Sequence, residues 1–149
     1  MKLHPSLPRH QGVVIDTMIW IYLFEDINPY ATPAEYLVQA MQEGRFHGVV
    51  TPVTIAELIV KPLENGREDI ADRYRQVLAT AENLSMVPVD YHTGWLAGSM
   101  RAKYSMPLPD MFQIAVCLQY DYPLLITNDK LLKKIKEVNV LLLNEAVIH

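Results

Sequence analysis

Four acidic residues stand where an apolar run ends or a helical pattern begins, and they are Asp16, Glu57, Asp110 and Asp129. A carboxylate in such a place either caps a helix or binds a hard cation such as Mg²⁺ through its oxygens. Thr54 and Glu57 have the spacing of a capping box, and Asp110 and Asp129 also fit helix caps. A cap accounts less well for Asp16, because apolar residues flank it and no Lys or Arg is near in sequence. A buried, unpaired carboxylate is costly, so a divalent cation is the hypothesis that accounts for all four acids together.

The apolar pattern that positions these acids predicts strands and helices in alternation. The strands are expected at residues 13–15, 48–51, 85–89, 123–127 and 140–143, and the helices at 17–24, 32–43, 54–61, 70–81, 90–100, 110–118 and 130–134. Such an alternation predicts an α/β fold of three layers (α/β/α) with a mainly parallel central sheet and right-handed crossovers. Ligands of these sheets bind at the carboxyl ends of the strands. We therefore expect the four acids to converge at one edge.

The composition describes one globular domain and excludes several classes of protein. Half of the 149 residues are hydrophobic, and the formal net charge is −4, so no global positive field attracts a polyanion. The single cysteine, Cys117, cannot form an intramolecular disulfide, and the five histidines lack the paired spacing of a zinc site. Residues 1–12 lack the apolar core of a signal peptide, and no apolar run is long enough to span a membrane. We expect a cytoplasmic protein with no membrane partner, an N-terminal extension at residues 1–12 and a single domain at 13–149.

Four stretches of this sequence, taken in order, resemble the PIN-domain ribonucleases, and most closely the VapC-type toxins of toxin–antitoxin systems. The matching stretches are residues 14–17, 54–58 with 61–63, 109–110 with 113–115, and 125–129. The acidic positions of that family fall on the four acids named above, and its hydroxyl residues at strand ends fall on Thr17 and Thr127, with Asn128 beside them. Two residues depart from the family pattern: Met18 replaces a small polar residue, and Cys117 replaces Ala.

The resemblance implies a metal-dependent endoribonuclease. One or two Mg²⁺ or Mn²⁺ ions held by the four acids would activate a water for attack on an RNA phosphodiester. It also implies a homodimer that a cognate antitoxin holds inactive. The candidates for RNA contacts are basic residues near Asp110 and Asp129, namely Arg101, Lys103, Lys130, Lys133 and Lys134, with Lys136 beside them. Alternatively, these basic side chains belong to a solvated helix face and do not contact RNA.

Two other functions remain open at the level of sequence. One is a PIN nuclease that acts in RNA maturation outside any toxin pair, and the other is a catalytically silent α/β interaction module. A phospho-accepting receiver domain fits poorly, because it needs an adjacent acidic pair where this chain has Asp16 and Thr17. For the aromatic residues Trp20, Tyr22 and Trp95, core or dimer packing is favoured over base stacking. Cys117 is expected to be a small buried hydrophobic residue.

Overall fold

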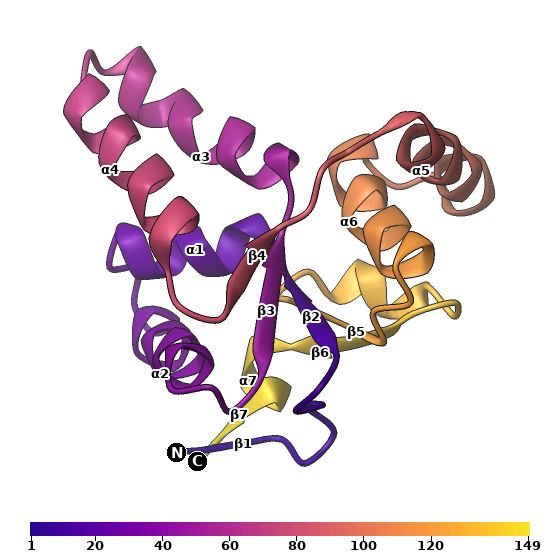
Figure 1. Ribbon diagram of the computed structural model, residues 1–149, viewed down its shortest axis with the longest axis horizontal. Coiled ribbons are helices and arrows are strands. Elements are labelled where there is room, and N and C mark those ends of the chain that lie inside the picture. The colour runs from indigo at the N-terminus through magenta and orange to yellow at the C-terminus, as the bar shows by residue number, and fades with distance from the viewer.

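A five-stranded sheet forms the centre of the computed structural model, which describes residues 1–149 (Figure 1). All neighbouring strands are parallel, in the order β4-β3-β2-β5-β6. The strands are β2 (Gly12–Ile15), β3 (His47–Val50), β4 (Leu84–Met86), β5 (Leu124–Thr127) and β6 (Asn139–Leu142). The strand order reverses beside β2, which pairs with both β3 and β5. This reversal is where α/β sheets of this kind bind their ligands.

Helices lie on both sides of the sheet, which confirms the predicted three-layer α/β architecture. On one side lie α1 (Thr17–Phe24), α2 (Ala31–Gln42), α3 (Pro52–Glu64) and α4 (Glu68–Thr80), and on the other side lie α5 (Tyr91–Tyr104) and α6 (Leu108–Gln119) (Figure 1). The 3₁₀ helix η1 (Lys130–Lys134) follows β5, and the short helix α7 (Leu143–Ala146) follows β6. None of the helices has the length and apolarity that a membrane crossing requires.

Alternate residues of the central strand β2 pack into two separate hydrophobic cores. Val13 and Ile15 lie in the core beneath α1 and α2, whereas Val14 lies in the core beneath α5 and α6. This two-sided burial explains why the strand reads as an unbroken apolar run. Trp20 is fully buried in the first core, as predicted, but Trp95 is 67% exposed on α5 and belongs to no core.

Helices α2 and α3 begin earlier than predicted, and the predicted capping box of Thr54 and Glu57 is wrong. Helix α3 begins at Pro52, and its N-cap is Thr51, whose Oγ1 accepts a hydrogen bond from the Val53 N–H at 3.2 Å. Proline suits the first helical position because its missing N–H would have no helical partner there and its φ is already fixed. Helix α2 begins at Ala31, without a side-chain cap. The helix that carries Glu57 therefore starts earlier than predicted, and Glu57 lies in its second turn.

The two ends of the chain form a small antiparallel sheet that the sequence analysis did not predict. Strand β1 (Lys2–Leu3) pairs with β7 (Val147–Ile148), and the termini lie together in Figure 1. The His4 N–H also donates to the Ala146 carbonyl at 2.8 Å. The N-terminal arm, which we define as residues 1–11, is thereby attached to the domain.

Candidate functional site

Asp16 lies at the carboxyl end of the central strand, and both of its carboxylate oxygens are held in place. Oδ1 accepts a hydrogen bond from the Thr17 N–H at 2.8 Å, and Oδ2 accepts one from the Thr127 hydroxyl at 2.7 Å. Thr127 ends the neighbouring strand β5, so the Asp16 side chain connects two adjacent strand ends. Only 4% of Asp16 is exposed.

Glu57 reaches the same strand ends from α3. The Thr17 hydroxyl donates to Glu57 Oε1 at 2.8 Å, while the Thr17 N–H binds Asp16. Thr17 is itself buried, and one residue therefore orients two of the four predicted acids. Glu57 is exposed, so its carboxylate remains open to solvent.

The other two acids differ in how they are held. Asp129 is the N-cap of η1: its Oδ1 accepts from the Leu131 N–H at 3.0 Å, and its own N–H donates to the Thr127 hydroxyl at 3.1 Å. Asp110 lies in the first turn of α6, a helix with no side-chain cap, and it makes no side-chain hydrogen bond or ion pair. The helix-cap interpretation is therefore right for Asp129 and wrong for Asp110. Asp16, for which a cap was not favoured, is the N-cap of α1.

The charges of these acids oppose one another. Burial, followed by the nearby charges of Glu57 and Asp129, raises the pKa of Asp16 to about 6, although its two hydrogen bonds act in the opposite direction. Burial and the charges of Asp16, Asp129 and Glu57 raise the pKa of Asp110 to about 6 as well. None of the four acids takes part in any of the five ion pairs of the chain. The site is therefore a concentration of negative charge with no basic side chain paired to it.

The donor set fits a hard divalent cation bound through water as well as protein. All four groups offer carboxylate oxygens, which Mg²⁺ and Mn²⁺ prefer. No three of them lie close enough to hold one ion together. Mg²⁺ commonly takes one or two carboxylates and keeps several waters, so one or two of these acids would suffice to hold it.

A hydrogen bond between two helices supports the site, and the sequence analysis did not find it. The Gln113 amide on α6 donates to the Thr54 hydroxyl on α3 at 3.1 Å, and both residues are buried. Gln113 lies one helical turn beyond Asp110, and Thr54 one turn before Glu57. Gln113 Oε1 has no hydrogen-bond partner although it is buried. In the sequence, the signal for this hydrogen bond was a polar residue three positions from each acid, which places it on the same helix face as the acid.

Asn128 faces a side chain of α1, because its Nδ2 donates to the Tyr22 hydroxyl at 3.0 Å. Its backbone N–H donates to the sulfur of Met18 at 3.1 Å. Tyr22 in turn stacks on Tyr30, with ring centroids 4.6 Å apart. These contacts fix the turn after β5 and engage one face of the Tyr22 ring. Met18, the departure from the family pattern, is part of that turn's support.

The structure pairs three of the five basic residues predicted to contact RNA with groups of the chain itself. Arg101 donates to the Met106 carbonyl at 2.8 Å. Lys103 pairs with Glu137 at 3.3 Å, and Lys133 pairs with Glu145 at 2.6 Å. The remaining two, Lys130 and Lys134, are exposed and form no ion pair.

The sequence-family model of the PIN domain matches residues 13–138, which is most of the chain. This chain belongs to the PIN-domain family. The match contains all four acids. It begins at residue 13, so the N-terminal arm lies outside it, and it ends before β6. The resemblance noted in the sequence is confirmed. A comparison with curated protein sequences found no significant match.

Solved structures of toxin–antitoxin proteins share this PIN-domain fold. The DNA-bound VapBC of Salmonella typhimurium superposes with a TM-score of 0.71 at 12% identity, over 89% of this chain and 98% of that one. VapBC-1 of nontypeable Haemophilus influenzae gives a TM-score of 0.65 at 19% identity, with the same coverage. VapC20 of Mycobacterium tuberculosis, a toxin that cleaves the sarcin–ricin loop, gives 0.64 at 11% identity over 76% of this chain and 86% of that one. At these identities the likeness establishes the fold.

Proposed function

We propose that this PIN domain is a metal-dependent endoribonuclease and the toxin of a type II toxin–antitoxin pair. The observation that carries the proposal is the arrangement around Asp16: a buried carboxylate with both oxygens fixed, three further acids around it and no cationic side chain. Membership of the PIN-domain family and the shared fold of VapC20 support cleavage of RNA. The VapBC complexes among the similar structures support the pairing with an antitoxin.

Each acid has a separate role in this proposal. A bound Mg²⁺ or Mn²⁺ would lower the pKa of a water and offset the charge of the leaving oxygen. Asp16 would hold the cation at the carboxyl end of β2, because Thr17 and Thr127 fix the orientation of its carboxylate. Glu57, which Thr17 orients, and Asp110, which makes no hydrogen bond, bind or orient the attacking water. Asp129 completes the negative field that attracts the ion, and its N-cap bond fixes its position.

For the antitoxin we propose a contact surface around a small cavity beside Glu57. This cavity of about 60 Å³ lies between α1, α3 and α4, and its apolar lining includes Ile21, Phe24 and Leu58. Farther along α3, Val60 and Leu63 are 49% and 45% exposed. An apolar peptide segment that covers this face would lie next to the acids, where a basic side chain could neutralise them. The expected inhibitor is therefore an amphipathic segment with a cation near one end.

For the homodimer we propose the outward face of α5. Tyr91 and Trp95 are 90% and 67% exposed there, and they lie one helical turn apart. No other part of the chain lies close to Gly94 or Gly98 on the same helix. A second copy would cover these aromatic rings. In sedimentation or light scattering, Trp95→Glu should shift the dimer to monomer, whereas the exposed helical change Arg73→Glu should not.

Cleavage of a single-stranded RNA, measured with and without EDTA, tests the nuclease. Wild-type protein should lose activity in EDTA and regain it with Mg²⁺ or Mn²⁺. Asp16→Asn should lower the rate by at least about 100-fold, because changes to groups that merely orient metal ligands already cost 10- to 100-fold. Asp72→Asn is the matched control, because it makes the same substitution at an exposed aspartate on α4. Full activity in EDTA would exclude the metal mechanism.

Growth measurements distinguish a toxin from a nuclease of RNA maturation. Expression of the wild-type chain should arrest growth, and expression of Asp16→Asn should not. Co-expression of the protein encoded by the adjacent reading frame should restore growth. That protein should also co-purify with the chain. Growth that continues in the presence of an active nuclease would assign the protein to RNA maturation instead.

A further inference from the structure

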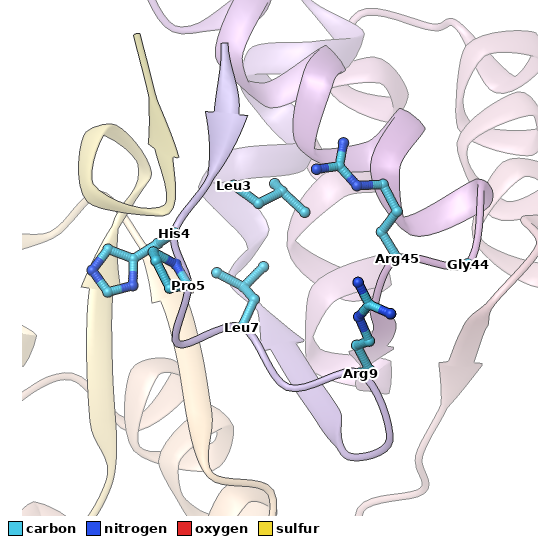
Figure 2. Close-up of a pocket in the computed structure, with 7 residues that line it drawn as sticks. All are labelled: Leu3, His4, Pro5, Leu7, Arg9, Gly44 and Arg45. Atoms are coloured by element: carbon cyan, nitrogen blue, oxygen red, sulfur yellow. The ribbon is translucent and has the colours of Figure 1, made fainter.

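A cavity of about 320 Å³ lies beneath the N-terminal arm, and no step of the proposed reaction uses it. It is lined by Leu3, His4, Pro5, Leu7, Arg9, Gly44 and Arg45. Five of these residues come from the arm, and two come from the turn between α2 and β3. Figure 2 shows Leu3, Leu7, Arg9 and Arg45 around the same space, whereas the imidazole of His4 lies on the opposite side of the arm. The polar side chains of this cavity are therefore two guanidinium groups.

Neither guanidinium has a carboxylate partner. The five ion pairs of the chain use other basic residues, and no acid lines the cavity. Arg45 donates from Nη1 to the Tyr36 hydroxyl at 3.1 Å and lies over the same ring, 5.8 Å from its centroid. One Arg45 donor is thereby occupied, and the rest of its planar fork is free. Arg9 makes no side-chain hydrogen bond at all, so its five donors are free.

The cavity lies at the opposite end of the sheet from the four acids. Arg9 precedes β2 and Arg45 precedes β3, so both stand at the amino ends of these parallel strands. Asp16 follows the carboxyl end of β2. Arg9 also lies outside the stretch that matches the PIN-domain family, which begins at residue 13. The arm thus adds a positive cavity to a fold whose proposed active site is elsewhere.

We propose that Arg9 and Arg45 bind a phosphate group in this cavity, separate from any phosphate that is cleaved. Two guanidinium groups at one cavity offer several free donors and two positive charges, which match the oxygens and charge of a phosphate better than those of one carboxylate. Leu3 and Leu7 give the cavity an apolar wall, and Tyr36 holds one fork in position. The phosphate can belong to a free nucleotide or to a length of RNA that passes the arm.

Calorimetric titration in EDTA tests this site without cleavage and independently of the nuclease proposal. The probes are inorganic phosphate, 5′-AMP, a 20-nucleotide single-stranded RNA and, as a carboxylate control, succinate. Arg9→Gln should weaken phosphate binding by about tenfold or more, since a hydrogen bond to a charged group is worth about 1.5–3 kcal/mol. Arg9 makes no internal hydrogen bond, so this variant should keep the wild-type melting temperature. Arg45→Gln should also weaken binding, and Arg45→Lys should restore part of it.

Arg73→Gln is the matched control, because Arg73 is exposed on α4 and forms no ion pair. Binding of phosphate and AMP that depends on Arg9 identifies a nucleotide or free phosphate site. RNA binding that depends on Arg9, without measurable binding of the small probes, identifies an RNA backbone site. The proposal is overturned if no probe binds, if Arg9→Gln and Arg73→Gln have equal effects, or if succinate binds as well as phosphate.

Discussion

The two ends of the central sheet carry opposite charge. At the carboxyl end, three further acids lie near Asp16, and burial together with the neighbouring negative charges raises the pKa values of Asp16 and Asp110 to about 6. At the amino end, Arg9 and Arg45 line a cavity that contains no acid. The carboxyl end therefore favours a cation and the amino end an anion, although the chain as a whole carries a charge of −4.

The two ends of the sheet are built from different parts of the chain. The carboxyl-end acids come from segments that follow β2 and β5 or from α3 and α6, and they lie within the PIN-domain match. The amino-end cavity depends on the arm outside that match. The net charge of −4, which gives no global attraction for a polyanion, averages over both ends and describes neither.

The largest effect is expected when two glutamates of the same helix, α3, are replaced in turn. Glu57→Gln should lower metal-dependent RNA cleavage by at least about 100-fold, because it removes a carboxylate that Thr17 holds beside Asp16. Glu64→Gln, the same change farther along α3, should leave the rate unchanged. The two rates are compared at saturating Mg²⁺. Equal rates for both variants would remove Glu57 from the site.

The pH dependence of stability should also reveal the uncompensated acids. In EDTA, the free energy of unfolding should fall as pH rises from about 4 to about 7. Asp16 and Asp110 have pKa values near 6 in the folded state, against 3.8 ordinarily, so the folded state binds more protons in this range and deprotonation favours unfolding. For Asp16 alone the loss is about 3 kcal/mol, at 1.36 kcal/mol per pKa unit.

Urea denaturation at several pH values measures this slope. Asp110→Asn should flatten it, since the variant loses one titrating group and one charge next to Asp16. The ion-paired Glu145, whose pKa is lowered mainly by its bond to Lys133, contributes in the opposite sense and at lower pH. A slope that is the same in wild type and Asp110→Asn would show that the acids are not coupled.

A smaller effect is expected from the link between α3 and α6. Gln113→Met removes the bond to Thr54 but also removes the unpartnered Oε1, so the free energy of unfolding should change by no more than about 1–2 kcal/mol. Cleavage should fall further than this stability change explains, and the half-saturating Mg²⁺ concentration should rise. Thr54→Val in the Gln113→Met background should add little more, as a double-mutant cycle would show. An unchanged Mg²⁺ requirement would make the link merely structural.

The smallest effect concerns the free lysines beside the carboxyl end. Replacing Lys130 and Lys134 by Ala should make single-stranded RNA binding less sensitive to salt. The slope of the logarithm of the binding constant against the logarithm of salt concentration should fall in magnitude by about 0.7 per lost phosphate contact. Lys133→Ala is the control, because Lys133 already pairs with Glu145. Binding is measured between low and moderate salt. A slope that changes only in Lys133→Ala would reverse the assignment of these lysines.

Local sequence patterns determined much of the fold. The run Val13–Ile15 predicted a strand buried on both sides, and the helix 17–24 was predicted with its observed bounds. The helix predicted at 90–100 begins where expected, because Asp90 caps α5 in a capping box with Thr93. These features depend on a few neighbouring residues, so periodicity and cap chemistry suffice. The start of α3 was also readable, because Thr51 and Pro52 form a cap and a first helical residue.

Tertiary structure decided how distant side chains meet. Gln113 and Thr54 are 59 positions apart, and Lys103 and Glu137 are 34 apart. Arg9 and Arg45 share a cavity only because the terminal arm pairs with β7 and passes the turn before β3. Helix spacing and apolar runs fix which residues face the sheet, but the crossing of elements over that sheet fixes which polar groups reach one another. The sequence therefore determined the strands and most of the helices, whereas packing decided which polar groups, the four acids among them, lie near one another.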